Sequence, residues 1–265
     1  MRATRDLDAG SEILINYDQQ LASHDSAQQN VLRLGNDGCD CKTCREDTTA
    51  GGANLAERVR LLEFVEKPLM DRLMETMRKP VRGNPPIELE VLPTIHEHRS
   101  LLAALDATYP PNYDSLRPTL SVPCLAISNI LSLQFNSPAI LLSIDFAISD
   151  LRCTGFVFYD TSPTTMEDIS SPMLIDFNRS DLRFGSTYGA DVFYSILYSL
   201  ERLGLKKRRE SWVRTFKRLE EILSGGGEEY FQFRHSEKLA WERIKYVFGL
   251  FDSDLMKVLH IPLDY

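Results

Sequence analysis

Apolar residues recur at three- and four-residue steps from residue 54 onward, which is the spacing of one face of an α-helix. The first such series is Leu55, Val59, Leu62, Val65 and Leu69. Pro68 allows two interpretations: it kinks one helix, or it starts a second helix at the first position. The pattern predicts helical structure over this region in either case.

Further helices are expected along the rest of the chain, with prolines and glycines at their ends. A short helix over 87–92 is expected to stop at Pro93, and the next helix, from Ile95 to Leu105, is expected to end at Tyr109-Pro110-Pro111. The later helices are predicted over residues 124–135, 137–148, 188–200, 206–223, 235–251 and 253–259. Glycines follow two of them, one near residue 204 and three at 225–227.

Two of these segments, 124–135 and 137–148, are apolar nearly all round, so we expect them to be the central helices of a helical domain. Segment 161–181 is rich in Ser, Thr, Pro and Asp and is predicted to be a long surface loop.

The first 46 residues have a different pattern. Asp8-Ala9-Gly10 has the composition of a turn, and Ile13, Ile15 and Tyr17 then alternate with Glu12, Leu14 and Asn16 as in a short strand. Residues 18–35 are expected to form a helix, and the polar, glycine-containing stretch from 45 to 52 is expected to be a linker between two domains.

Three of the five cysteines lie within six residues, at Cys39, Cys41 and Cys44. Thiolates this close together can converge on one soft metal ion, and tetrahedral zinc suits them best. Asp40, His24, a water, or either Cys124 or Cys153 folding back could supply a fourth ligand; alternatively, the three are simply free surface cysteines. Cys124 and Cys153 have apolar sequence neighbours, which favours a reducing compartment over a disulfide framework.

Net charge and hydropathy disfavour two classes of protein, general nucleic-acid binders and membrane-spanning proteins. The net charge of −8 disfavours general nucleic-acid binding, and no apolar run is long enough to span a membrane. The basic segment Lys206-Lys207-Arg208-Arg209 could be an import signal or a patch for an acidic partner, but glutamates at 201, 210, 220 and 221 favour a solvated, charge-balanced helix face. His96 and His98 are two residues apart and would point apart on a helix, so we expect them on the surface rather than at a metal.

Residues 3 to 44 resemble the end of the SET domain and the post-SET cysteine cluster of SET-domain protein lysine methyltransferases. The resemblance is carried by Ala3-Thr4-Arg5-Asp6-Leu7-Asp8-Ala9-Gly10-Ser11-Glu12-Ile13-Leu14-Ile15-Asn16-Tyr17, followed by Cys39-Asp40-Cys41-Lys42-Thr43-Cys44. The cysteine spacing, with a helical tail behind it, is most similar to the SET-and-MYND type and to related fungal SET proteins.

This resemblance implies specific roles. Tyr17 would line the channel that holds the substrate lysine while a methyl group is transferred from S-adenosylmethionine, and Cys39, Cys41 and Cys44 would hold zinc. The family's cofactor-binding segments and fourth zinc ligand precede this pattern, so the chain is expected to be a truncated form or an incomplete gene model. Gly38 stands where the family has an aromatic residue that packs on the cofactor's adenine.

The sequence therefore predicts a mainly α protein with two parts. Residues 1–46 would be the C-terminal part of a SET domain with a short β element and a post-SET zinc knot, and residues 53–265 an α-helical C-terminal domain. The predicted function is that of a protein-lysine N-methyltransferase family member, inactive in this truncated form; the alternative is a non-catalytic helical protein-interaction module that retains the zinc site. The methyltransferase would act on a histone or another protein, and the interaction module would bind one. Both are expected in the nucleus or cytoplasm.

Overall fold

The computed structural model describes residue 45 and residues 52–78, 87–110, 116–132, 137–159, 174–180 and 185–235. These residues are mainly α-helical, which confirms the predicted fold class at that level. The helices are α3 (Gly52–Leu61), α4 (Lys67–Arg78), α5 (Ile87–Asp106), α6 (Ser121–Ser132), α7 (Ser137–Cys153), α8 (Gly185–Arg202), α9 (Lys206–Ser224) and α10 (Glu228–His235). The predicted strand, the zinc knot and the helices expected after residue 235 lie outside the described residues.

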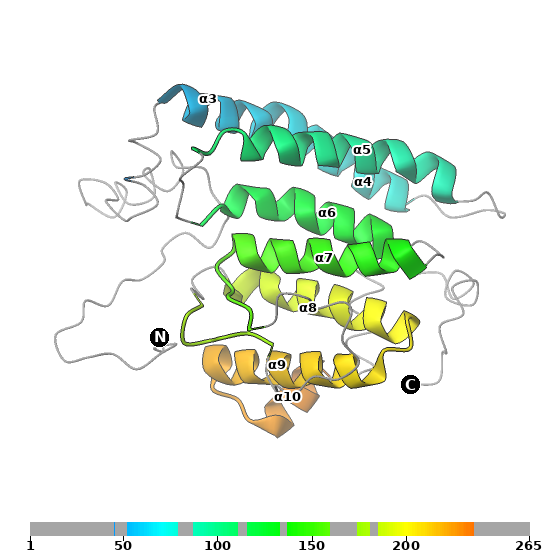
Figure 1. Cartoon of the computed structure of the whole chain (residues 1–265), viewed down its shortest axis with the longest axis vertical. Coiled ribbons are helices and arrows are strands. Elements are labelled where there is room, and N and C mark those ends of the chain that lie inside the picture. Colours follow the sequence, from blue (N-terminus) through cyan, green and yellow to red (C-terminus); the bar gives the residue numbers. More distant parts are fainter. Residues whose placement is uncertain are drawn as a thin grey trace.

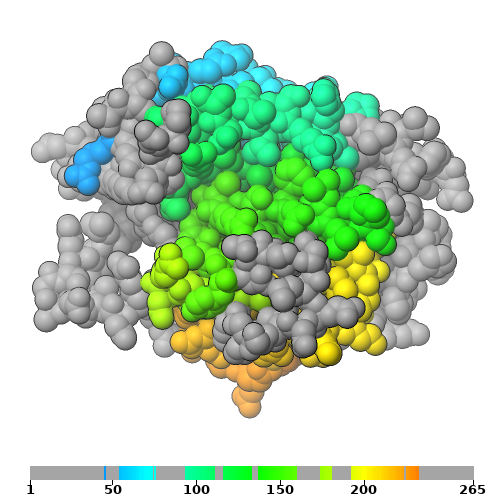
Figure 2. Space-filling model, viewed as in Figure 1, coloured from blue at the N-terminus to red at the C-terminus, as the bar shows by residue number. Residues whose placement is uncertain are grey.

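The helices are stacked in chain order. In Figure 1, α3 and α4 lie at one side of the stack with α5, then come α6, α7 and α8, and α9 and α10 lie at the other side. The space-filling view in Figure 2 shows the same succession across the visible surface. Helices α6 and α7 pack most extensively on each other and contact α5 and α8 on either side, so the prediction that they are central is confirmed.

A π-helical turn, η1 (Leu62–Glu66), joins α3 to α4 without a break. The amide of Lys67 donates to the carbonyl of Leu62, five residues earlier, instead of four as in an α-helix. Pro68, the second residue of α4, has no amide hydrogen, and its ring would clash with the carbonyl four residues back in a regular helix. A widened turn just before the proline relieves this conflict, so the helix continues past it.

Helix α5 runs from Ile87 to Asp106 with Pro93 inside it, so the predicted stop at Pro93 is wrong. Proline in a helix interior costs about 3 kcal/mol because of its missing hydrogen bond and its ring. Pro93 is exposed, while Ile95, Leu101 and Leu105 beyond it are buried against neighbouring helices. Burial of that apolar face favours one long helix over two short ones.

Prolines also occupy the first turns of other elements, where their missing amide hydrogens leave no helical bond unmade. The short 3-10 turn η2 (Pro118–Leu120) begins with one, and Pro123 and Pro138 lie in the first turns of α6 and α7. Helix α7 begins at Ser137, as predicted.

Buried serines line the contacts among α6, α7 and α8. Ser128 Oγ lies 3.3 Å from Ser195 Oγ, and Ser143 Oγ lies 3.0 Å from Ser199 Oγ. Ser143 also donates to the carbonyl of Ile140 at 2.7 Å. These small side chains let the helices approach closely while each hydroxyl keeps a hydrogen-bond partner.

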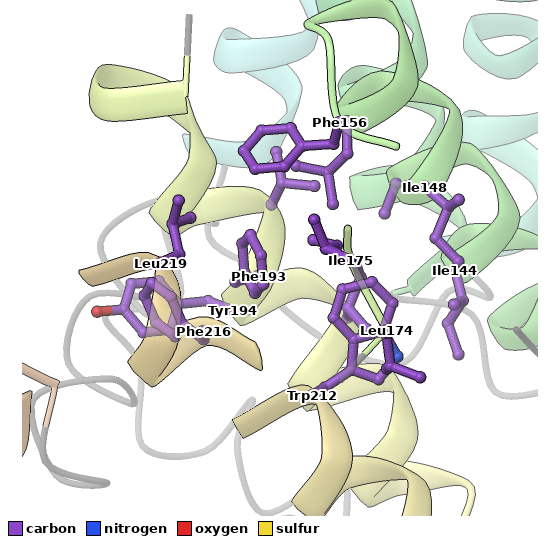
Figure 3. Packing of buried hydrophobic residues seen from close by; sticks show 14 of the residues in the cluster. Ile144, Ile148, Phe156, Leu174, Ile175, Phe193, Tyr194, Trp212, Phe216 and Leu219 are labelled. Atoms are coloured by element: carbon purple, nitrogen blue, oxygen red, sulfur yellow. The ribbon is translucent and has the colours of Figure 1, made fainter. Parts of the chain in front are cut away.

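The largest apolar cluster lies between α7, α8 and α9. Figure 3 shows Phe193 and Tyr194 of α8 facing Trp212 and Phe216 of α9. The Phe193 ring stacks on Phe216 with 4.8 Å between centroids and meets Trp212 edge-on at 5.6 Å. Phe193, Trp212 and Phe216 are at most 1% exposed, so these aromatic contacts form the centre of the core.

The segment from Leu174 to Ser180 contributes to this core, which corrects part of the surface-loop prediction for 161–181. Leu174 and Ile175 are 2% and 1% exposed, and Ile175 forms an isolated antiparallel bridge with Phe158. The amide of Leu174 also donates to Thr215 Oγ1 of α9 at 3.2 Å. Residues 160–173 and 181 lie outside the described residues.

Glycines end the last long helices where the sequence predicted. Gly204, after α8, has a φ of 70°, and Gly225, after α9, has a φ of 72°, both in the left-handed region that glycine adopts without a steric penalty. The amide of Gly225 donates to the carbonyl of Glu221 at 2.9 Å. Helix α10 then begins at Glu228, a helix that the sequence pattern did not predict.

Candidate functional site

A cluster of buried polar side chains lies where α6 begins and α7 ends. Ser121 and Cys124 come from the first turn of α6, and Asp150 and Cys153 come from the last turn of α7. The hydroxyl of Ser121 donates a hydrogen bond to Asp150 Oδ1. Ser121, Cys124 and Asp150 are each 2% exposed, so three of the four side chains are almost completely removed from water. We call these four residues the α6–α7 polar cluster.

Asp150 is the acidic group of the α6–α7 polar cluster. Burial raises the pKa of its carboxyl to about 7, against the smaller opposing effect of the hydrogen bond from Ser121. Its second oxygen, Oδ2, has no hydrogen-bond partner among the described residues. A buried carboxylate with one free oxygen is costly when charged, so near neutral pH this carboxyl can hold or release a proton.

The two thiols of the cluster are in contact. Cys124 and Cys153 are free cysteines, and their thiols are hydrogen-bonded to each other. This bond, followed by burial, raises the pKa of Cys124, and the negative charges of Asp150 and Asp106 act in the same direction. Cys153 is partly exposed and packs against the apolar cluster of α3, α4 and α5. Cys124 is therefore the inner thiol and Cys153 the outer one.

Two arginines enclose Tyr109 beside the α6–α7 polar cluster. The Arg58 guanidinium of α3 lies 3.7 Å from the centroid of the Tyr109 ring, and that of Arg117 lies 5.5 Å away. Arg58 Nε donates to Thr108 Oγ1 at 2.9 Å, and Arg117 Nη1 donates to Asp106 Oδ1 at 2.6 Å. These contacts tie α3 and the segment before α6 to the end of α5.

Two other ionisable groups, Glu66, which is half-buried, and His98, which is buried, lie away from the cluster. Burial raises the pKa of Glu66, in the π turn, to about 7, and its Oε2 has no hydrogen-bond partner among the described residues. Burial lowers the pKa of His98, whose Nδ1–H donates to the carbonyl of Thr94 at 2.8 Å. His96 is exposed and His98 is fully buried, so the two do point apart, but the expected surface position is wrong for His98.

The basic helix α9 is paired with nearby acids. Arg209 Nε lies 2.9 Å from Glu201 Oε2, and Arg218 Nη1 lies 2.9 Å from Glu221 Oε2. Lys217 Nζ lies 2.6 Å from Glu228 Oε1 of α10. These pairs support the predicted charge balance, but Arg208 and Glu220 are 3% and 6% exposed, so the prediction of a solvated face is wrong for these two residues.

The site residues predicted from the sequence, Tyr17, Cys39, Cys41 and Cys44, lie outside the described residues. In the described part of the chain, no group of three or more His, Cys, Asp and Glu side chains is placed to hold a metal ion. The pairing of Cys124 with Cys153 was not predicted. No local pattern in the sequence could have predicted it, because it depends on how α6 and α7 pack against each other.

No protein-family model matches the chain, and no curated protein or solved structure is significantly similar to it. None of the described helices is both long and apolar enough to cross a membrane. The resemblance to SET-domain proteins therefore rests on the motif residues between 3 and 44 alone.

Proposed function

We propose that this chain is a SET-related protein whose helical body is a protein-interaction module beside a post-SET zinc segment. The supporting observation is the stack in Figure 1, in which each helix packs against its neighbours in chain order. Helical arrays of this kind present long continuous surfaces, and protein partners are their usual ligands. The helical-pair arrays that follow the SET domain in the SET-and-MYND type are the counterpart implied by the sequence resemblance.

The charge of the chain points to a basic partner. The net charge is −8, and charge complementarity speeds encounter and selects partners. Histone tails are basic and are substrates of the resembled family. A histone tail bound through the helical body, without methyl transfer, is thus the interaction that this proposal specifies.

Binding of a fluorescently labelled histone H3 tail peptide, followed by anisotropy, tests the interaction. We expect saturable binding that weakens as salt is raised, because opposite charges contribute. A scrambled peptide of the same composition is the matched control. Equal binding of both peptides would reduce the interaction to nonspecific charge attraction, and no binding of either would refute the proposal.

Metal analysis tests the zinc segment. Cys39, Cys41 and Cys44 would supply three thiolates, and we expect about one zinc per chain, the stoichiometry of one structural site. Serine at any of the three should lower the zinc content, while Cys153→Ser, a cysteine paired within the helical body, should leave it unchanged. Zinc content that is insensitive to all three substitutions would refute the site.

Protein-lysine methylation is the second candidate, favoured by the motif that ends at Tyr17. A tyrosine hydroxyl at that position would orient the lysine amine toward the methyl group of S-adenosylmethionine, as the resemblance implies. Calorimetric titration with S-adenosylmethionine and transfer of labelled methyl groups to histones separate the two candidates. Transfer that is lost in Tyr17→Phe would establish the enzyme, and absence of both cofactor binding and transfer would leave the interaction module.

A further inference from the structure

The thiols of the α6–α7 polar cluster are held together by the antiparallel packing of two central helices. Cys124 lies one turn after Ser121, and Cys153 lies one turn after Asp150. The Ser121–Asp150 hydrogen bond joins the same two turns, and the thiols of Cys124 and Cys153 are in contact. Two contacts therefore join α6 to α7 at this end, the Ser121–Asp150 hydrogen bond and the contact between the two thiols. The thiol contact could become a covalent bond.

The end of α7 is fixed as well. Thr154 Oγ1 donates to the carbonyls of Asp150 and Leu151, and the amide of Phe156 donates to the carbonyl of Leu151 at 2.9 Å. Phe156 is 3% exposed and belongs to the main core. Cys153 is thus held between an anchored helix end and a buried loop, so its thiol stays beside that of Cys124.

We propose that Cys124 and Cys153 form a reversible disulfide that joins the start of α6 to the end of α7, with a hydroperoxide as the oxidant. This inference concerns the helical body and does not depend on the proposed interaction with histones or on zinc. It assigns a modification site to two residues of the α6–α7 polar cluster that the proposed function does not use.

The reaction begins at the outer thiol. Cys153 is partly exposed, so its sulfur can attack the terminal oxygen of the hydroperoxide; the O–O bond breaks, and a sulfenic acid and an alcohol, or water from hydrogen peroxide, are formed. The sulfur of Cys124 then attacks the sulfenic sulfur, the S–O bond breaks, and the departing hydroxide takes the Cys124 proton to leave as water. The two thiols lose two electrons and two protons, which the peroxide accepts. Thiol reductants reverse the product by exchange.

The negative charge of Asp150 raises the pKa of the Cys124 thiol and so disfavours its thiolate. Cys124 therefore attacks the sulfenic sulfur as a thiol, and its proton leaves with the departing hydroxide as water.

Peptide mapping of the folded full chain tests the proposal. The protein is treated with hydrogen peroxide, free thiols are blocked with iodoacetamide, and trypsin digestion is carried out without reductant. Trypsin does not cut before proline, so Cys124 falls in peptide 100–152 and Cys153 in peptide 153–179. We expect these two peptides to be linked, with a mass two hydrogens below their sum, and to separate after dithiothreitol.

Variants identify the order of events. In Cys124→Ala the sulfenic acid of Cys153 should persist and be trapped by dimedone, because the resolving thiol is gone. In Cys153→Ser neither the link nor dimedone labelling of Cys124 should appear, because the inner thiol is shielded. Cys44→Ser is the matched control and should leave the link intact.

Three results would overturn the proposal. Peptides 100–152 and 153–179 could both carry alkylated thiols after peroxide treatment. Cys153 could advance to sulfinic acid in the wild-type chain without linking. The link could instead join either cysteine to Cys39, Cys41 or Cys44.

Discussion

Replacing Asp150 by asparagine should remove the pH dependence that this buried carboxyl gives to stability. In the folded protein, burial raises the pKa of Asp150 to about 7, whereas its usual value is 3.8. Between these values the folded state keeps a proton that the unfolded state has lost. The free energy of unfolding therefore falls as pH rises through this window, and the contribution is fully present only below the lower value.

The size of the effect follows from the two pKa values. Each pKa unit corresponds to 1.36 kcal/mol, so the shift from 3.8 to about 7 amounts to about 4 kcal/mol as an upper limit. Asparagine cannot ionise and its oxygen can still accept from Ser121, but its amide hydrogens would meet no partner where Oδ2 now lies. An unsatisfied buried donor costs about 1–3 kcal/mol. Asp150→Asn should thus be less stable than wild type at pH 4 by about that amount and more stable at pH 8 by about 1–3 kcal/mol.

Urea unfolding followed by circular dichroism at several pH values between 4 and 8 measures this difference. Glu66 and His98 also titrate, but they are present in both proteins, so their contributions cancel when the variant is subtracted from wild type. Ser121→Ala is a useful companion, since it removes the hydrogen bond without removing the carboxyl. A wild-type-minus-variant difference that stays constant from pH 4 to pH 8 would refute the assignment of Asp150 as a buried, proton-holding group.

Three other predictions concern the stability of the described helices. Trp212→Ala removes a fully buried ring whose centroid lies 5.6 Å from that of Phe193, and it should lower the free energy of unfolding by about 3–5 kcal/mol. Phe64→Ala, at a 69% exposed position, should change the free energy of unfolding by no more than about 0.5 kcal/mol. Equal losses of stability in the two variants would contradict this core. Gly225→Ala places a side chain at a φ of 72° and should cost about 1 kcal/mol, seen as a lower thermal midpoint, and an unchanged midpoint would argue against a left-handed helix end. His98→Leu should abolish a loss of stability as pH falls below 6.5, because burial lowers the pKa of His98 and protonation then favours the unfolded chain; a persistent loss would point to another group.

The central helices could be predicted because their sequence signals are local and agree. Segments 124–135 and 137–148 are apolar, and Ser137-Pro138 marks the start of the second. Helix α7 does begin at Ser137, and α6 and α7 lie in the middle of the stack. Local composition, periodicity and end signals therefore sufficed for these helices.

Pro93 shows where local signals fail. The proline correctly indicates an unfavourable position within a helix. It carries no information about the residues on α4 and α6 against which Ile95, Leu101 and Leu105 pack. Their burial outweighs the local cost, so one helix forms where two were expected. In the same way, the polar, proline-containing composition of segment 161–181 predicted a surface loop and gave no sign that Leu174 and Ile175 are buried. Their burial depends on helices that are distant in the sequence.

The sequence predicted one set of candidate site residues and missed the other, the α6–α7 polar cluster. The motif through Tyr17 and the cysteines at 39, 41 and 44 are local patterns, and they lie outside the described residues. The contact between Cys124 and Cys153 joins helices whose relative register no local pattern specifies. Only the packed pair of helices brings these two thiols together beside Asp150.

The π turn before Pro68 also sets the rotational phase of everything that follows it in the long α3–α4 helix. Leu61 and Leu69 are eight residues apart, and in a regular α-helix they would be rotated by about 80° from each other. The extra residue in the π turn brings both into one buried cluster with α5. Converting Leu62–Glu66 to regular α-helical hydrogen bonding at constant length would rotate the apolar face of α4 by about 100° away from α5, whereas deleting one residue from it would leave Leu61 and Leu69 seven residues apart and within about 20° of the same face. The π turn therefore lets the chain carry one more residue before Pro68 while α4 keeps its apolar face toward α5.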